Sequence, residues 1–157
     1  MVKVLFLCLG NICRSPMAEA VFRDMVRKQG LENEISIDSA GIGKWHVGNP
    51  PHIGTRKLLD GLSISYEGMK ARQIQYNDWD EFDYIIAMDD QNITDMKAIR
   101  DQVEGVVVGK LMEFAATPAE TNVPDPYFTD NFDYTYELVK DGCKGLLNYI
   151  SQNDKLS

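Results

Sequence analysis

The chain has 157 residues, of which 44% are hydrophobic and 25% charged, with a formal net charge of −8 and a pI near 4.7. These values are typical of one globular domain and exclude the disordered, collagen-like and membrane-spanning classes. The acidic balance disfavours nucleic acid and anionic membranes as partners, because both attract clustered Lys and Arg.

The first predicted unit is a strand followed by a helix. Val4–Leu7 is a continuous apolar run, as in strands that are buried on both faces of a parallel sheet. Ser15 is a candidate N-cap and Pro16 a candidate first helical residue. Apolar residues then recur at helical spacing until Gly30. They are Met17, Ala18, Val21, Phe22 and Met25.

Two further strand and helix units follow. Apolar and polar residues alternate over residues 35–39, and a loop rich in Gly and Pro leads to a short helix around residues 55–62. Residues 82–88 form the next predicted strand. Asp89 and Asp90 follow it directly, and acidic residues there favour the start of a helix over a metal pair. The apolar positions of that helix are Ile93, Met96 and Ile99.

The last elements complete an alternating pattern. Residues 106–108 are a β-branched run, residues 117–127 are an extended loop with three prolines, and a long helical stripe follows. That stripe comprises Tyr136, Val139, Cys143, Leu146, Leu147 and Ile150. Alternation of strands and helices predicts a doubly wound parallel sheet with helices on both faces, in a single domain over residues 1–157.

The cysteine content indicates a reducing compartment. The three cysteines, Cys8, Cys13 and Cys143, are odd in number and form no zinc-type pair. The N-terminus carries no secretory signal pattern. We therefore expect a cytoplasmic protein.

The segment from Cys8 to Arg14 lies at the carboxyl end of the first strand, where such folds bind ligands. A loop of this length can close around a tetrahedral oxyanion with its N–H groups pointing inward. Gly10 and Asn11 tolerate the left-handed backbone angles that such a loop visits. The N–H groups and the guanidinium favour the Cys8 thiolate as a nucleophile, and Ser15 can donate a hydrogen bond to its sulfur.

A second segment supplies a candidate general acid. Cleavage of a phosphate ester bound in this loop needs an acid that protonates the leaving group. Asp125 lies between Pro124 and Pro126, whose fixed φ angles restrict the segment and can hold the carboxyl over the bound phosphate. Tyr127 and Phe128 follow and predict the wall of a cleft for a flat phenyl ring.

Residues 8–16, together with residues 125–127, resemble the low-molecular-weight protein tyrosine phosphatase family. The similarity continues through residues 38–41, Trp45 and further segments and covers essentially the whole chain. Those segments are residues 71–74 and 82–89. The resemblance implies a flavodoxin-like fold with a four-stranded parallel sheet. It also implies a phosphocysteine intermediate, with no metal or other cofactor.

The resemblance also implies roles. Cys8 is the nucleophile, Arg14 binds phosphate, Asp125 acts as acid and then base, and Ser39 supports the loop. Residues implied to bind substrate, activate the sulfur or shape the cleft are Leu9, Gly10, Asn11, Ile12, Cys13, Ser15, Trp45, His46, Tyr127 and Phe128. Expected partners are phosphotyrosine-containing proteins, a tyrosine kinase among the candidates, acted on by a monomer or, alternatively, a weak dimer.

Two positions depart from the family pattern, and the roles of two cysteines need separate treatment. Met69 falls where the family often has a histidine that supports the loop asparagine, and Phe128 replaces a second tyrosine. Cys13 either forms a reversible disulfide with Cys8 or packs in the interior. Cys143 is predicted to pack in the core, because it lies on the apolar stripe of the last helix.

Three other functions are alternatives to phosphatase activity. Arsenate reduction by a thiol relay needs another cysteine, and residues 14–142 contain none. A Cys–His hydrolase would use His46 or His52 as its base. A non-catalytic phosphate-binding module would need no acid, so Asp125 favours turnover.

Overall fold

The computed structural model describes residues 1–116 and 120–154. Its centre is a parallel sheet of four strands in the order β2-β1-β3-β4. The strands are β1 (Val2–Cys8), β2 (Ile35–Gly41), β3 (Tyr84–Ala87) and β4 (Val107–Lys110). The predicted doubly wound, flavodoxin-like fold is confirmed.

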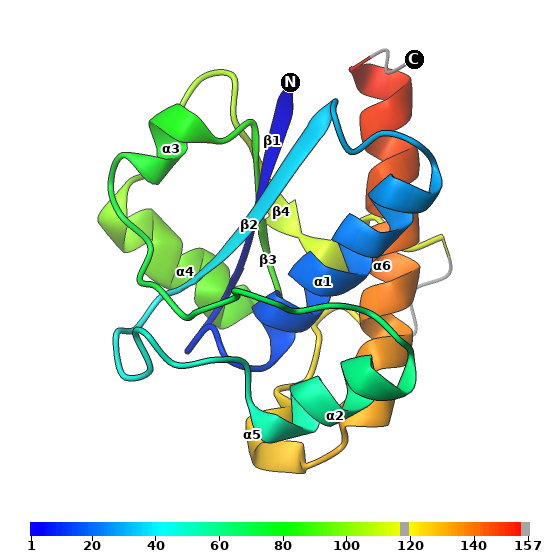
Figure 1. Ribbon diagram of the computed structural model, residues 1–157. Coiled ribbons are helices and arrows are strands. Elements are labelled where there is room, and N and C mark those ends of the chain that lie inside the picture. Colours follow the sequence, from blue (N-terminus) through cyan, green and yellow to red (C-terminus); the bar gives the residue numbers. More distant parts are fainter. Residues whose placement is uncertain (117–119, 155–157) are drawn as a thin grey trace.

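Helices cover both faces of the sheet (Figure 1). Helices α1, α2 and α6 lie on one side, and α3 and α4 lie on the other. The helices are α1 (Arg14–Lys28), α2 (Ile53–Gly61), α3 (Asp78–Glu81), α4 (Asp90–Ile99), the 3₁₀ helix η1 (Leu111–Glu113), α5 (Pro126–Thr129) and α6 (Phe132–Asn153).

Successive residues of β1 point into opposite layers of the core, because side chains alternate along a strand. Val4 and Phe6 belong to the cluster beneath α1 and α6, whereas Leu5 and Leu7 belong to the cluster beneath α3 and α4. All four side chains are fully buried. The prediction that the apolar run forms a central strand buried on both faces is therefore confirmed.

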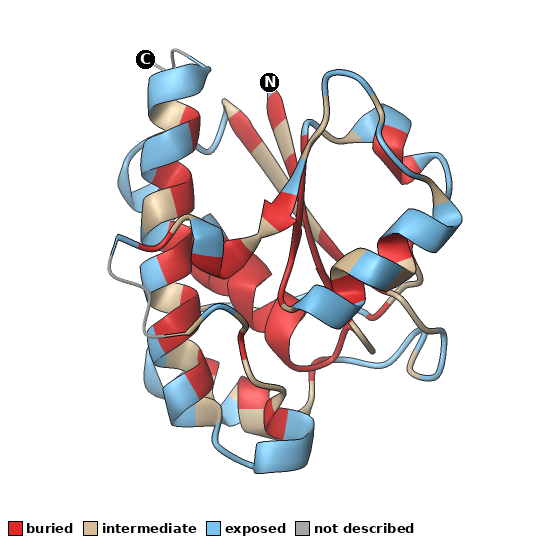
Figure 2. Cartoon of the chain, turned by 180° about the vertical axis from the view of Figure 1, so that it is seen from behind, coloured by how far each residue is buried: buried red, intermediate tan, exposed pale blue. Residues whose placement is uncertain are grey.

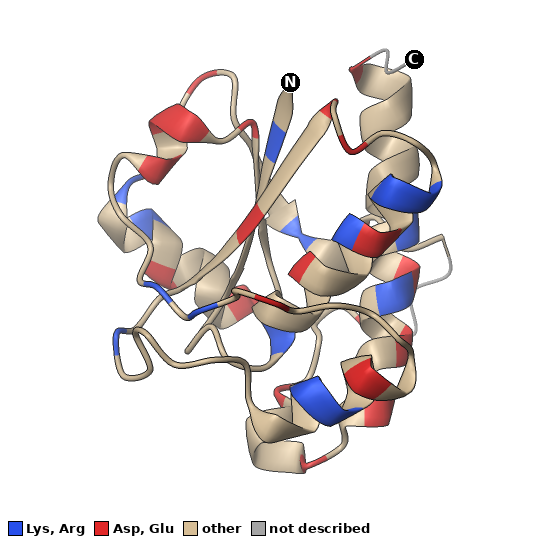
Figure 3. Ribbon diagram, viewed as in Figure 1, with Lys and Arg blue, Asp and Glu red and all other residues tan. Residues whose placement is uncertain are grey.

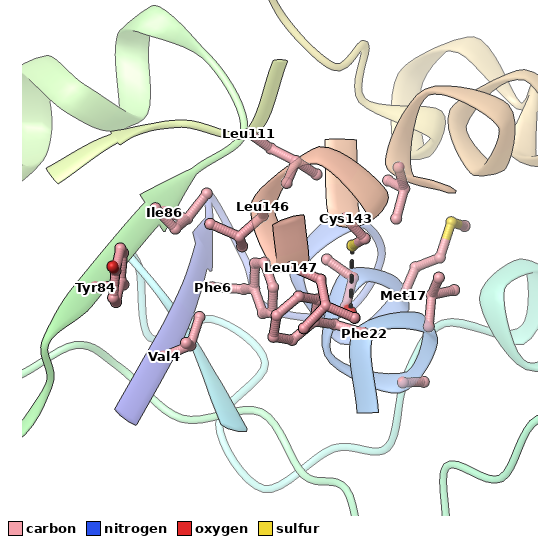
Figure 4. Packing of buried hydrophobic residues seen from close by; sticks show 14 of the residues in the cluster. Val4, Phe6, Met17, Phe22, Tyr84, Ile86, Leu111, Cys143, Leu146 and Leu147 are labelled. Carbon is pink, nitrogen blue, oxygen red and sulfur yellow. Dashed lines mark hydrogen bonds between the residues drawn. The ribbon is translucent and has the colours of Figure 1, made fainter. Parts of the chain in front are cut away.

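The larger layer of the core is built on α1 and α6 (Figure 4). The rings of Phe6 and Phe22 meet edge to face with centroids 5.4 Å apart. Cys143 is buried among them and its sulfur lies 3.8 Å from the Ala18 carbonyl oxygen. Burial raises the pKa of Cys143, and its predicted packing role is confirmed. Figure 2 shows the buried stripe of α6 facing inward and its exposed stripe facing away.

Several boundaries differ from those predicted. Helix α1 begins at Arg14 rather than at Pro16, because the Cys13 carbonyl already accepts a hydrogen bond from the Met17 N–H. Cys13, not Ser15, is the N-cap, and Pro16 lies within the first turn, where no N–H partner is required. The last strand lies at residues 107–110 instead of 106–108.

The predicted loop over residues 117–127 is shorter than expected at its end. Residues 117–119 lie outside the described residues, and Pro126 opens the short helix α5. Within the described ranges, none of the helices combines the length and apolar character that a membrane span requires.

Candidate active site

Residues 8–14, here called the phosphate loop, join the end of β1 to the start of α1. Asn11 has a φ of 58°, in the left-handed region. Gly10 does not adopt a positive φ, so the expectation for it is wrong. Its missing side chain instead leaves room for a neighbour, since a Cβ there would lie 3.1 Å from the His46 ring.

The Cys8 sulfur is buried and contacts one group of the phosphate loop and one group of α1. It lies 3.0 Å from the Ser15 hydroxyl oxygen, and the Asn11 N–H donates to it at 3.3 Å. A thiolate has no proton to donate, so Ser15 must be the donor once Cys8 is ionised. Both contacts stabilise negative charge on sulfur.

The Asn11 side chain connects the phosphate loop to three parts of the fold. Its amide nitrogen donates to the hydroxyls of Ser15 at 2.8 Å and Ser39 at 3.0 Å. Its carbonyl oxygen accepts the Arg72 N–H at 2.9 Å. Gly41 permits this approach, because a Cβ on it would lie 3.0 Å from the Asn11 nitrogen. The loop geometry is therefore set from β2 and residue 72 as well as from α1.

A buried carboxylate on α1 continues this network. Ser39 donates to Glu19 at 2.5 Å, and Glu19 also pairs with Arg23. Burial raises the pKa of Glu19, although the Ser39 hydrogen bond and the Arg23 charge oppose the shift. A carboxylate only accepts, so it directs the Ser39 proton toward itself and leaves the Ser39 oxygen to accept from Asn11.

Arg14 is almost fully buried, with 2% of its surface exposed. One terminal nitrogen donates to Asp89 at 2.6 Å and to the Val123 carbonyl at 3.0 Å, and the other donates to Asp125 at 3.3 Å. Burial lowers the pKa of Arg14, but the charges of Cys8 and the two aspartates outweigh it and raise the pKa overall. The buried Nε lacks a hydrogen-bond partner among the described residues. It is free to bind an oxyanion.

Asp125 faces the same cleft from α5. One carboxylate oxygen accepts the Tyr127 N–H at 3.1 Å and so caps α5, while the other is the one that pairs with Arg14. The carboxyl is thus held at the mouth of the phosphate loop. Pro126 at the first helical position fixes the backbone that carries it.

The cleft above the phosphate loop has a volume of about 370 Å³. Its lining residues are Cys8, Leu9, Gly10, Ile12, Cys13, Trp45, His46, Asp125, Tyr127 and Phe128. We call Trp45, His46, Tyr127 and Phe128 the aromatic rim. Trp45 is 68% exposed and Phe128 is 74% exposed, so aromatic side chains border the cleft where it meets solvent.

The remaining predicted positions lie close to this cleft or beneath it. Cys13 is buried and lines the cleft, and burial together with the charges of Asp125 and Cys8 raises its pKa to about 12. Met69 packs against the core and borders a small cavity of about 10 Å³ beside Asn11 and Ser39. Within the described ranges, no group of three His, Cys, Asp or Glu side chains is arranged to hold a metal ion.

Sequence reasoning missed two supporting residues. Asp89 caps α4 in a reciprocal pair with Asn92, as its position predicted, but its other carboxylate oxygen also binds Arg14. Its place at the carboxyl end of β3, beside β1, was the available signal. Glu19 gave a weaker one, as an acid on the buried face of α1.

Charged residues of both signs are interspersed on α1, α2 and α4 (Figure 3). The positive charge that an anion would meet at this cleft is therefore local. It consists of Arg14, the loop N–H groups and the start of α1.

Comparisons with known proteins agree with this geometry. The model of a family described as "Low molecular weight phosphotyrosine protein phosphatase" matches residues 3–156. The chain is 49% identical over 156 residues to the low molecular weight protein-tyrosine-phosphatase YfkJ of Bacillus subtilis, covering 99% of this chain and 100% of that protein. It is 44% identical to PtpA of Staphylococcus epidermidis, covering 99% and 98% of the two chains.

A solved structure supports the same relationship. The crystal structure of Bacillus subtilis YfkJ matches with a TM-score of 0.94 and 50% identity, covering 99% of this chain and 98% of that one. The resemblance seen in the sequence is confirmed, and this chain belongs to the low molecular weight phosphotyrosine protein phosphatase family; the two curated relatives named above are protein-tyrosine-phosphatases.

Proposed function

We propose that this protein hydrolyses phosphotyrosine in proteins, and small aryl phosphates, through a phosphocysteine intermediate on Cys8. One observation carries the proposal. Cys8 and Asp125 line one cleft of about 370 Å³, and the buried Arg14, whose Nε has no partner among the described residues, donates to Asp125 beside it. These are the nucleophile, the anion binder and the acid that phosphate ester cleavage needs.

In the first step the Cys8 thiolate attacks phosphorus and the bond to the aryl oxygen breaks. Protonated Asp125 gives its proton to the departing oxygen, so that a phenol leaves instead of a phenoxide. Arg14 and the loop N–H groups hold the equatorial phosphate oxygens as charge builds on them. Ser15 stabilises the sulfur before attack.

In the second step water attacks phosphorus and the bond to sulfur breaks. Asp125, now a carboxylate, takes a proton from the attacking water, and the Cys8 thiolate leaves with the Ser15 hydrogen bond stabilising it. Inorganic phosphate is the product. The enzyme regains its thiolate and a protonated Asp125.

The aromatic rim supports a phosphotyrosine substrate. Rings that border a deep anion site can pack on a flat phenyl group, and a short aliphatic ester would leave them uncovered. We infer that the partners are phosphotyrosine-containing proteins in the cytoplasm, a tyrosine kinase among the candidates. We further infer one catalytic domain over residues 1–157 that acts as a monomer or a weak dimer.

We also propose that Cys13 protects Cys8 by a reversible disulfide. Peroxide would oxidise the Cys8 thiolate to a sulfenic acid, and Cys13 would then displace water from it. Both thiols are free and line the same cleft. Because the pKa of Cys13 is raised to about 12, this closure should be slow at neutral pH. Peptide mapping after peroxide treatment tests it, and its absence in Cys13→Ser is the control.

The catalytic proposal is tested by hydrolysis of p-nitrophenyl phosphate and a phosphotyrosine peptide without added metal, with a phosphoserine peptide as the control. Rapid acid quench with radiolabelled substrate should trap label on Cys8. Turnover of the aryl esters alone, with label on that cysteine, is the expected result. Tight phosphate binding without turnover would favour a non-catalytic phosphate-binding module instead.

A further inference from the structure

The segment that begins α2 touches both the phosphate loop and the aromatic rim. The His52 N–H donates to the Ile12 carbonyl oxygen at 2.7 Å, and the buried Thr55 hydroxyl donates to the Cys13 carbonyl at 3.2 Å. Helices α2 and α5 lie next to each other in both views (Figures 1 and 2). Residues 52–55 therefore lie between the phosphate loop, which is the floor of the cleft, and the aromatic rim, which is its wall.

The His52 ring contacts two aromatic rings. It stacks on Phe132 at the start of α6, with centroids 5.3 Å apart and planes inclined by 19°. Its other neighbour is Tyr127, which it meets edge to face at 5.9 Å. His52 is not among the described residues that line the cleft. It therefore supports the aromatic rim from outside the cleft.

The His52 imidazole makes two kinds of interaction, a helix cap and ring contacts. Its Nδ1 accepts the Gly54 N–H at 3.0 Å and caps α2, while the ring faces contact the aromatic side chains. Gly54 allows the stack to close, since a Cβ there would lie 2.3 Å from the Phe132 ring. The cap and the stack are separate interactions that separate substitutions can remove.

We propose that His52 is a positioning residue that fixes the Tyr127 wall relative to the phosphate loop and thereby sets the preference for aryl over non-aryl phosphates. The inference rests on the proposed function, because it assigns the wall a role in binding the phenyl ring. Tyr127 is 53% exposed, and its ring contacts the rings of three residues, His46, His52 and Phe128. Among these three residues in the described part of the chain, only His52 also donates its N–H to the backbone of the phosphate loop.

Two ligands distinguish the contribution of the aromatic rim to binding from that of the phosphate loop. Inorganic phosphate reports on the phosphate loop, and phenylphosphonate reports on the loop together with the aromatic rim. The ratio of their dissociation constants, measured by calorimetry, is the contribution of the rim. Neither ligand is turned over, so the measurement does not depend on catalysis.

Three variants test the proposal. His52→Asn keeps a cap acceptor and removes the ring, so phenylphosphonate binding should weaken about twofold to tenfold while phosphate binding stays unchanged. His52→Phe keeps a ring and removes the acceptor, so the melting temperature should fall while the ratio stays near that of the unchanged protein. Lys57→Gly, at an exposed position within α2, is the control for a destabilised helix with an intact stack.

Hydrolysis of a phosphotyrosine peptide adds a second readout. His52→Asn should raise KM with kcat nearly unchanged, because the reacting groups keep their places. An unchanged ligand ratio in His52→Asn, or equal weakening of both ligands, would overturn the inference. If the unchanged protein binds both ligands but hydrolyses no aryl phosphate, the proposed function fails, and the ratio still decides the role of His52.

Discussion

The phosphate loop and the aromatic rim are the floor and the wall of one cleft, yet they are held in different ways. The floor is buried and fixed by directional hydrogen bonds, as for Asn11, whose side chain makes three of them. The rim is exposed and held by ring contacts, as between Tyr127 and Phe128 at 5.2 Å. Directional bonds fix reacting atoms, whereas ring contacts tolerate varied partners. Chemistry and recognition are therefore separable in this molecule.

The largest loss should follow removal of the nucleophile. Cys8→Ser should reduce kcat by about 10⁴-fold or more, while phosphate still binds because Arg14 and the loop N–H groups remain. Steady-state kinetics and calorimetry measure the two effects. Cys143→Ser makes the same exchange in the core and should retain activity. Loss of phosphate binding in Cys8→Ser would show that the floor itself had been disturbed.

Removal of the acid should have a large effect that depends on the leaving group. Asp125→Asn should slow hydrolysis of esters with poorly acidic alcohols by about 10²- to 10⁴-fold, and of p-nitrophenyl phosphate far less, because only the former need a proton. A series of substituted phenyl phosphates measures the dependence of kcat on leaving-group acidity. Equal losses across that series would remove Asp125 from this role.

A smaller effect should follow when the hydrogen bonds beneath the floor are reversed. Glu19→Gln replaces an acceptor with a group that can donate, which leaves Ser39 without its fixed orientation. We expect kcat to fall by about tenfold, as for the loss of one buried hydrogen bond. A Glu19→Asp variant, which retains an acceptor, should recover part of the loss. Full activity in the Gln variant would show that the network has no influence on the sulfur.

The same variant tests the ionisation of Glu19. Its pKa is raised in the native state, so the folded protein holds this proton more tightly than the unfolded chain. The stability that this group provides is therefore present at low pH and is lost as the pH rises through the native pKa. Relative to Glu19→Gln, the free energy of unfolding of the unchanged protein should decrease as the pH rises above the ordinary pKa of a glutamate side chain. Urea titrations measure it, and an increase would contradict the assignment.

The smallest effect should come from the rim. Phe128→Ala should raise KM for a phosphotyrosine peptide about twofold to fivefold and leave kcat unchanged, because the Phe128 ring is 74% exposed and packs on the Tyr127 ring. Tyr76→Ala, at a 62% exposed aromatic residue outside the cleft, is the matched control. A fall in kcat would mean that rim and floor are coupled.

The sequence predicted what depends on neighbouring residues. The apolar run of β1 and the spacing of Cys8 and Arg14 are local patterns, and they located both the central strand and the phosphate loop. The start of α1 was predicted late, because Ser15 and Pro16 resemble a helix start while the Cys13 carbonyl had already begun the hydrogen-bond series.

Two contacts between residues far apart in the chain were not predicted from the sequence. Asp89 correctly indicated a helix cap, but its bond to Arg14 joins residues 75 positions apart. Glu19 stands four residues before Arg23, a spacing usual for exposed ion pairs, and only the packing of α1 against β2 shows that it is buried. Such roles arise when the chain closes on itself.

The Asn11 amide has a further consequence for how this enzyme comes into being. Its three partners stand 4, 28 and 61 positions away along the chain, so no short fragment can reproduce the anion receptacle. Catalytic competence should emerge only at the final, cooperative stage of folding. Activity regained during refolding should then track the last structural phase, and a synthetic peptide spanning the nucleophile should be inert.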